Sequence, residues 1–243
     1  MKGHELTRRG NPSLKHGNIP LEFLNKLQQV KYRVNTTVLD VAQHFRERGI
    51  KVGKFIPISE AFKPPKPPDI EENQEAKQAW KRATAEAYNT DRINFKRSVR
   101  TRTQLEAAEK FREEEFYLPW SFDYRGRAYP IPAFLTPQDT DFGKACIRFA
   151  NESPLDKEAE QWLAFQVATT YGLDKSTMDD RLEWVGRHRS LISQIAIDPI
   201  GYLPDWENAE EPWQFMAACH EYYHCCLRKD KHTTGLMVAV DAT

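Results

Sequence analysis

The sequence predicts a mainly helical α+β chain with a small antiparallel β portion, and three observations carry this prediction. From residue 73 to residue 114 neither Gly nor Pro occurs, and residues of high helix propensity dominate. Apolar residues recur at helical spacing over residues 35–48. Aromatic residues flank Gly126 on both sides, which is the pattern of a strand, a turn and a second strand. We therefore expect long helices beside one short hairpin.

The first predicted element is an amphipathic helix over residues 35–48. Its apolar positions fall at i, i+4, i+7 and i+11 from Val34. Asn35 is a suitable capping residue before it, and Gly49 is a suitable terminator after it. The apolar face needs a partner, and we expect the segment around Leu24, which has matching apolar spacing, to supply it.

The sequence K-P-P-K-P-P at residues 63–68 cannot be helical and predicts an extended connector at a domain boundary. The long helical stretch that follows is expected to break near Asn89 and Thr90. The remaining predicted elements are a hairpin over residues 116–131, a helix closed by Gly172, helices over residues 178–197 and 212–227, and a short apolar strand over residues 235–243.

Charge is balanced overall but uneven along the chain. Thirty-five Lys and Arg residues oppose 35 Asp and Glu residues among 243, which excludes a basic surface over the whole protein. Residues 1–59 carry a net charge of +7, residues 77–102 carry +6, and residues 198–230 carry −5. We expect the basic front half to face a polyanion, the alternative being solvated helix surfaces.

The composition indicates a soluble, folded protein of a cytoplasmic compartment. No apolar run approaches the roughly 18–20 residues that cross a bilayer, and the first residues lack the apolar core of a secretion signal. No membrane partner is expected. The cysteines are few and lack the spacing of a disulfide framework, so we expect reduced thiols: Cys146, Cys219, Cys225 and Cys226.

Two segments contain residues suited to nucleic-acid chemistry. Arg125 and Arg127 flank Gly126, so two guanidiniums stand at a turn where backbone can approach closely, as in a phosphate clamp. The alternative is a surface hairpin whose arginines pair with acids. Asp241 follows an apolar strand, where a carboxylate can bind a metal ion or simply form a turn.

Residues 220–224 match the H-E-x-x-H pattern, which places two imidazoles on one helix face for zinc with Glu221 as the base. A third ligand would have to come from Asp230, His232, Asp241 or from upstream. The same helix offers a competing interpretation, because Phe215, Cys219, Tyr222 and Cys226 form a buried stripe. Buried structural cysteines are likewise favoured over a Cys/His metal cluster.

Taken in order, four segments resemble the bacteriophage-type single-subunit DNA-directed RNA polymerases, a family that includes the mitochondrial enzymes. Residues 31–42 resemble its W-K-I-N-x-x-V-L-x-V-A segment, with Tyr32 in place of Trp. Residues 79–83 resemble the thumb sequence A-W-K-R-A, and residues 116–129 resemble the palm sequence F-Y-x-P-x-x-x-D-x-R-G-R-x-Y. Residues 236–241 resemble motif A, which ends in the first catalytic aspartate.

The resemblance implies an incomplete right-hand polymerase fold with five parts. These are the end of an N-terminal domain with its connector (residues 1–68), thumb helices (69–114), a first palm segment with the D-x-R-G-R hairpin (115–150), a helical palm insertion (151–234) and the motif A strand (235–243). In the family, the fingers and the second metal-binding aspartate follow motif A. Ala242 and Thr243 stand where the family usually has Gly and Ser.

The resemblance also implies roles for individual residues. Asp241 would be catalytic and would ligate both ions of a two-Mg²⁺ site, and the Ala242 carbonyl would reach one of them, so the site is only partly encoded here. Arg125 and Arg127 would hold backbone phosphates. The thumb would contact nucleic acid through Lys81, Arg82, Arg92, Lys96 and Arg97.

The implied partners are a DNA template, an RNA transcript and ribonucleoside triphosphates, in the host cytoplasm if a phage encodes the chain. We expect the isolated chain to be inactive unless a second polypeptide supplies the fingers and the rest of the palm. A non-catalytic nucleic-acid-binding module is the main alternative function, and a zinc metallohydrolase is the second.

Overall fold

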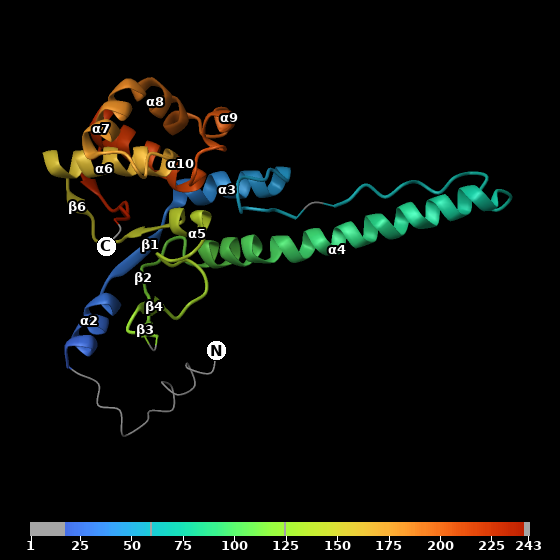
Figure 1. The fold of residues 1–243 in the computed structure, drawn as a ribbon, viewed down its shortest axis with the longest axis horizontal. Helices are drawn as coiled ribbons and strands as arrows, with labels where there is room; N and C mark the ends of the chain where they lie inside the picture. Colours follow the sequence, from blue (N-terminus) through green and yellow to red (C-terminus); the bar gives the residue numbers. More distant parts are fainter. Residues whose placement is uncertain (1–17, 59, 124, 241–243) are drawn as a thin grey trace.

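A computed structural model describes residues 18–58, 60–123 and 125–240. A helical lobe and a long arm meet at a small central sheet (Figure 1). Strand β1 (Lys31–Val34) pairs antiparallel with β2 (Phe116–Tyr117) on one side and with β5 (Ile147–Phe149) on the other. Tyr32 and Val34 are buried on one face of this sheet. The sheet therefore joins three segments that lie far apart in the sequence, and the α+β class is confirmed.

The helical lobe is built around α10 (Pro212–Tyr222), which is buried along nearly its whole length. Asp141 caps this helix from α5 (Asp141–Ala145), because its carboxylate accepts the backbone N–H groups of Trp213 at 2.9 Å and Gln214 at 3.0 Å. Burial is the main cause of a raised pKa for this carboxyl. The rest of the lobe consists of α6 (Lys157–Tyr171), α7 (Met178–Arg187), α8 (Arg189–Ile197), α9 (Leu203–Trp206) and a π-helical turn, η1 (Tyr223–Leu227).

An aromatic cluster fastens α3 (Thr36–Arg48) to the lobe. Phe45 on α3 lies 5.9 Å from Trp206 and 5.7 Å from Trp213, measured between ring centroids. Phe55, in the turn after α3, lies 4.8 Å from Phe142 and 4.9 Å from Trp213. Aromatic pairs at such separations add stabilisation beyond the area they bury. This cluster, and not the segment around Leu24, covers the apolar face of α3.

Helix α2 (Asn18–Gln28) packs on the hairpin instead, so its predicted packing against residues 35–48 is wrong. The hairpin consists of β3 (Trp120–Phe122) and β4 (Ala128–Pro130), as predicted. Phe23 stacks on Phe122 at 6.0 Å, and the side chain of Gln28 accepts the backbone N–H of Trp120. Apolar spacing alone could not choose between two apolar surfaces that are both available to this helix.

The arm is a single helix, α4 (Gln74–Lys110), of 37 residues, which corresponds to about 55 Å. Asn73 caps it by accepting the N–H groups of Glu75 and Ala76. The predicted break near Asn89 and Thr90 is wrong. The Asn89 side chain accepts a hydrogen bond from Arg92 on the helix surface, so it does not compete with the backbone bonds of the helix.

Most other predicted elements are confirmed, with differences at their ends. Gly49 and Gly172 end α3 and α6. The helix predicted over residues 178–197 is divided at His188, and the one over 212–227 finishes in the π-helical turn. The strand predicted over residues 235–243 is absent from its described part, residues 235–240. Strand β7 covers only Thr233–Thr234 and pairs with β6 (Ser153–Pro154).

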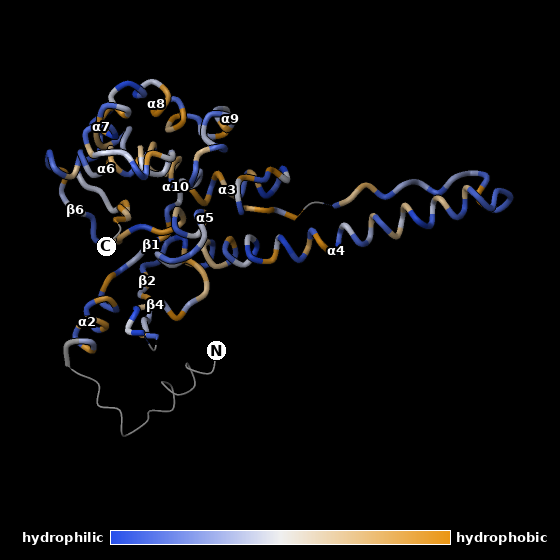
Figure 2. Tube along the Cα trace, in the orientation of Figure 1, coloured by the Kyte–Doolittle hydropathy of each residue, from blue (hydrophilic) through white to orange (hydrophobic). Residues whose placement is uncertain are grey.

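Hydrophobicity along the chain follows this division into lobe and arm (Figure 2). The arm is mostly hydrophilic, whereas apolar segments gather where the lobe, α3 and the sheet meet. Among the helices of the described ranges, none combines the length and the apolar character that crossing a membrane requires.

Two phenylalanines after α3 provide a matched test of the aromatic cluster. Phe55→Ala should lower the free energy of unfolding by about 3–5 kcal/mol, because the cluster around Phe142 and Trp213 loses its central ring. Phe62→Ala should change it by less than about 0.5 kcal/mol, because Phe62 is 83% exposed. Urea unfolding followed by tryptophan fluorescence measures both, and equal losses would contradict the assignment of the core.

Candidate nucleic-acid interface

After α3 the connector runs outward from the body along one face of α4, and α4 then returns to the body (Figure 1). We call residues 56–70 the strap. Its backbone N–H groups bond to the arm, from Ile56 to the Thr101 hydroxyl at 3.0 Å and from Ala61 to the Asp91 carboxylate at 2.6 Å. In the other direction, the Trp80 indole N–H donates to a strap carbonyl at 3.0 Å. The proline-rich sequence has no regular structure, as predicted, and it leaves the other face of the arm open.

The basic residues predicted to contact nucleic acid lie on that open face. An α-helix turns by about 100° per residue, so these basic residues occupy an arc of about 160° around α4. The strap-facing residues Trp80, Asp91 and Thr101 lie outside this arc. All five side chains are exposed. Arg92 donates to Asn89, and within the described ranges none of the five forms an ion pair. The five residues are Lys81, Arg82, Arg92, Lys96 and Arg97.

Asp123 makes hydrogen bonds across the hairpin turn. Its carboxylate accepts the backbone N–H groups of Arg125 and Arg127, each at 2.9 Å, while its own N–H donates to the Arg127 carbonyl at 2.9 Å. The bond from the Arg127 N–H is the main reason that the pKa of Asp123 lies below its ordinary value. Gly126 has a φ of +80°, a conformation that costs glycine little.

This loop presents both arginine side chains on the outside of the molecule, where they are exposed. The role of Asp123 was missed at the level of the sequence. The Asp123 carboxylate accepts the backbone N–H groups of the residues two and four positions later in the chain. An Asp that accepts the N–H two residues on is the signature of an Asx-type turn, so the sequence D-Y-R-G-R contains a signal for this role. Arg125 and Arg127 thus place two exposed guanidiniums on one turn, and a guanidinium is the side-chain group best suited to bind phosphate oxygens.

A second carboxylate, that of Asp139, connects the hairpin region to the arm. Its side chain has no solvent exposure. It accepts hydrogen bonds from Arg100 at 2.6 Å and Gln104 at 3.0 Å on α4, and from the backbone N–H groups of Leu135 and Thr140. Nothing in the local sequence distinguishes this acid from an ordinary turn residue, because its partners are 35 and 39 residues away.

The predicted residues therefore fall into separate places. The arginines of the hairpin lie at the base of the molecule, while the basic residues of α4 extend along the arm (Figure 1). Asp241 and Ala242, the predicted catalytic and metal-binding residues, lie outside the described residues. The segment leading to them, residues 235–240, has no regular structure.

The H-E-x-x-H pattern does not form a favourable zinc site. The rings of His220 and His224 are 4.6 Å apart, but Glu221 is bound in ion pairs with Arg148 and Lys231. Burial lowers the pKa of His220 to about 4. In the part of the chain that the structure describes, no three His, Cys, Asp or Glu residues are grouped so that they could hold a metal ion.

The cysteines are all free, as predicted. Cys146, Cys219 and Cys225 are buried, and burial raises the pKa of the Cys225 thiol to about 11. A thiol with a raised pKa is a poor nucleophile and a poor metal ligand at neutral pH. The predicted stripe on α10 is confirmed for Phe215, Cys219 and Tyr222, which supports the structural interpretation of this helix.

Comparison with known proteins gives a consistent result. Residues 153–243 match the family model described as DNA-dependent RNA polymerase. The chain is 28% identical over 222 residues to the mitochondrial DNA-directed RNA polymerase of Neurospora crassa, a match that covers 90% of this chain and 16% of that protein. It is 31% identical over 201 residues to the DNA-directed RNA polymerase of Enterobacteria phage T3 and to T7 RNA polymerase of Escherichia phage T7, covering 82% of this chain and 22% of each relative.

The chain thus spans about a fifth of the length of these relatives. The family model includes the segment that leads to Asp241, and the relatives come from both phages and mitochondria. The chain belongs to the phage-type DNA-directed RNA polymerase family.

Proposed function

We propose that this chain is the part of a DNA-directed RNA polymerase that grips nucleic acid and carries the first catalytic carboxylate. The observation that carries the proposal is the loop at residues 123–127, where Asp123 fixes the backbone and both arginine side chains remain exposed. Guanidiniums held in this way bind phosphate oxygens with paired hydrogen bonds. The loop has the sequence that this family carries in its palm.

The arm contributes to the grip through charge. Its open face carries five basic residues that are not neutralised by acids among the described residues, so phosphate binding there releases counterions without first breaking ion pairs. The strap stiffens the opposite face and keeps the basic face outward. We assign residues 69–114 to the thumb and residues 115–150 to the first palm segment.

The other assignments follow the same family plan. Residues 1–68 belong to the end of an N-terminal domain, residues 151–234 form a palm insertion, and residues 235–243 carry motif A. The substrates would be a DNA template, an RNA transcript and ribonucleoside triphosphates. In the family plan the fingers and the remaining palm follow motif A, and without them residues 1–243 should bind nucleic acid weakly and synthesise nothing.

Asp241 and the Ala242 carbonyl offer hard oxygen donors, the kind that Mg²⁺ takes. Bound Mg²⁺ would lower the pKa of the RNA 3′ hydroxyl and stabilise charge on the phosphate undergoing attack. In the family plan the second metal-binding aspartate follows motif A, so it would complete the ligand set together with Asp241. The contribution of this chain is to hold the hybrid and to place one carboxylate.

Replacing the hairpin arginines should weaken nucleic-acid binding. Arg125→Ala with Arg127→Ala removes the two guanidiniums that contact phosphates, so the affinity for an RNA–DNA hybrid should fall and the slope of log Kd against log salt should drop by about one unit per lost contact. Fluorescence anisotropy measures both quantities. Arg187→Ala with Arg189→Ala removes equal charge from the lobe and should have little effect, so equal losses in both pairs would contradict the proposal.

The two faces of the arm should differ. Lys96→Ala with Arg97→Ala removes charge from the open face and should lower hybrid affinity and the salt slope. Lys66→Ala with Lys77→Ala removes the same charge beside the strap, where both lysines pair with Glu71, and should leave binding nearly unchanged. The same anisotropy titration applies, and a larger loss in the strap pair would refute this orientation of the arm.

Asp241→Ala should separate the polymerase from a binding module. Supplied with a polypeptide carrying the fingers and remaining palm of a phage-type relative, the wild-type chain should extend an RNA primer on a DNA template. Asp241→Ala should reduce extension to background while leaving hybrid affinity unchanged, because the carboxylate serves the chemistry and not the grip. Synthesis that survives the substitution would show that Asp241 is not the catalytic acid.

A further inference from the structure

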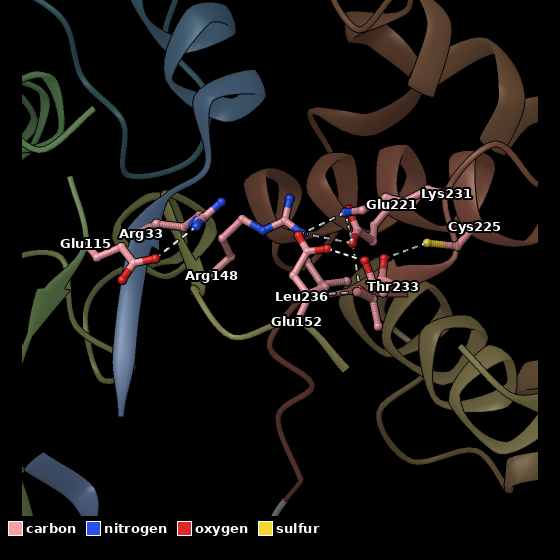
Figure 3. A network of polar contacts seen from close by, with 10 residues as sticks. Arg33, Glu115, Arg148, Glu152, Glu221, Cys225, Lys231, Thr233 and Leu236 are labelled. Atoms are coloured by element: carbon pink, nitrogen blue, oxygen red, sulfur yellow. Dashed lines mark hydrogen bonds and ion pairs between the residues drawn. The ribbon is translucent and has the colours of Figure 1, made fainter. Parts of the chain in front are cut away.

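Glu221 is the centre of a polar cluster between β5, the π-helical turn and the segment that leads toward motif A (Figure 3). Its residue is 5% exposed. One carboxylate oxygen accepts hydrogen bonds from Arg148 at 3.2 Å, from Lys231 at 2.6 Å and from the Thr234 hydroxyl at 2.7 Å. Two of these three partners belong to residues 231–236, which we call the anchored segment.

A second acid completes the cluster. Glu152 pairs with Arg148 at 2.5 Å and with Lys231 at 3.6 Å, and it accepts a hydrogen bond from the Thr233 hydroxyl. Two carboxylates and two cations therefore neutralise one another in a partly buried site. The Thr234 hydroxyl also accepts the backbone N–H of Leu236 at 3.2 Å, so the contact of Glu221 extends to the backbone beyond Gly235.

Gly235 is pressed against β5 at the middle of the anchored segment. Its carbonyl accepts the backbone N–H of Phe149 at 2.8 Å. A Cβ atom at this position would stand 2.4 Å from the Phe149 carbonyl oxygen and 3.2 Å from Nε of Arg148. Backbone cannot yield at such a distance, so the close approach requires glycine.

We propose that Glu221 is a positioning residue: by holding the anchored segment, it fixes the point from which the chain continues toward Asp241. This role rests on the proposed function. Residues 235–240 have no regular structure. Among the described residues after Leu236, the one hydrogen bond to the rest of the chain is donated by the Ala239 N–H to the Gln166 side chain. Leu236 and Met237 also pack against the hydrophobic core, so the anchored segment is the main polar attachment of this stretch. Glu221 holds this segment through Lys231 and the Thr234 hydroxyl, and it ties the segment to Arg148 on β5.

The energetics favour a positional role over a purely stabilising one. A buried ion pair contributes little to stability relative to apolar residues of similar size, and its recognised use is to specify one arrangement among several. The cluster lies at the end of α10, away from the aromatic core around Trp213. Removing the charge of Glu221 should therefore loosen the anchored segment before it affects the lobe.

Hydrogen exchange of the whole chain tests this anchoring directly. Glu221→Gln keeps the shape of the side chain but leaves Arg148 and Lys231 to share one acid, so the amides of Phe149 and Leu236 should exchange about tenfold faster. Amides within α10 should keep their wild-type rates. Glu115→Gln is the matched control, because Glu115 also binds two cations, Lys31 and Arg33, but does not contact the anchored segment.

Gly235→Ala provides a second variant that leaves every charge in place. It should speed the exchange of the same two amides by forcing the segment away from β5. In the completed polymerase, both variants should lower kcat roughly tenfold to a hundredfold through misplacement of Asp241, with KM for the nucleotide unchanged. Glu115→Gln should leave both constants at wild-type values.

Unchanged exchange at Phe149 and Leu236 in Glu221→Gln would overturn the inference. So would loss of protection throughout α10, which would indicate a structural role, or faster exchange with an unchanged kcat. Failure of the proposed function has a different signature, namely a completed wild-type complex whose synthesis is absent or independent of Asp241. In that case the exchange rates alone decide whether Glu221 anchors the segment.

Discussion

The buried carboxylate of Asp139 determines how the two exposed basic elements are arranged. Having no contact with solvent, it must find its hydrogen-bond donors within the protein. Arg100 and Gln104 supply them from the root of the arm, and Leu135 and Thr140 supply them from the chain that follows the hairpin. Gln138, one residue earlier, donates to the Ala128 carbonyl of β4. Satisfying one acid thus fixes the direction in which the arm leaves the body relative to the hairpin.

Charged residues serve opposite purposes in the two halves of the molecule. Along α4 and at the hairpin tip they stay exposed, where they can exchange small counterions for phosphates. Around Arg148 and Glu221 two acids and two bases pair with one another and hold the backbone of the anchored segment in place. The zero net charge of the chain conceals this separation.

Features determined by neighbouring residues could be predicted from the sequence, whereas those determined by distant partners could not. Asn35, Gly49 and Gly126 mark their helix ends and turn through local backbone chemistry, and the structure has all three where the pattern indicates. Asp139 looks like an ordinary turn residue and Glu221 looks like part of a zinc-binding pattern, because the side chains of Arg100, Gln104 and Arg148 that they bind lie on other elements. Residues 235–240 have the composition of a strand, but strand formation needs a neighbouring ladder, and the described chain offers Gly235 a single bond from Phe149.

Because the strap runs alongside α4, the length of the arm can change over evolution through the insertion of only a few residues. The chain travels outward in extended form and returns as α4, so both ends of the arm remain at the body. One added turn of α4 lengthens the return path by about 5.4 Å, which an extended strap matches with about two residues. Paired insertions near the tip at Asn73 could therefore lengthen the reach along nucleic acid while leaving the root at Asp139 undisturbed.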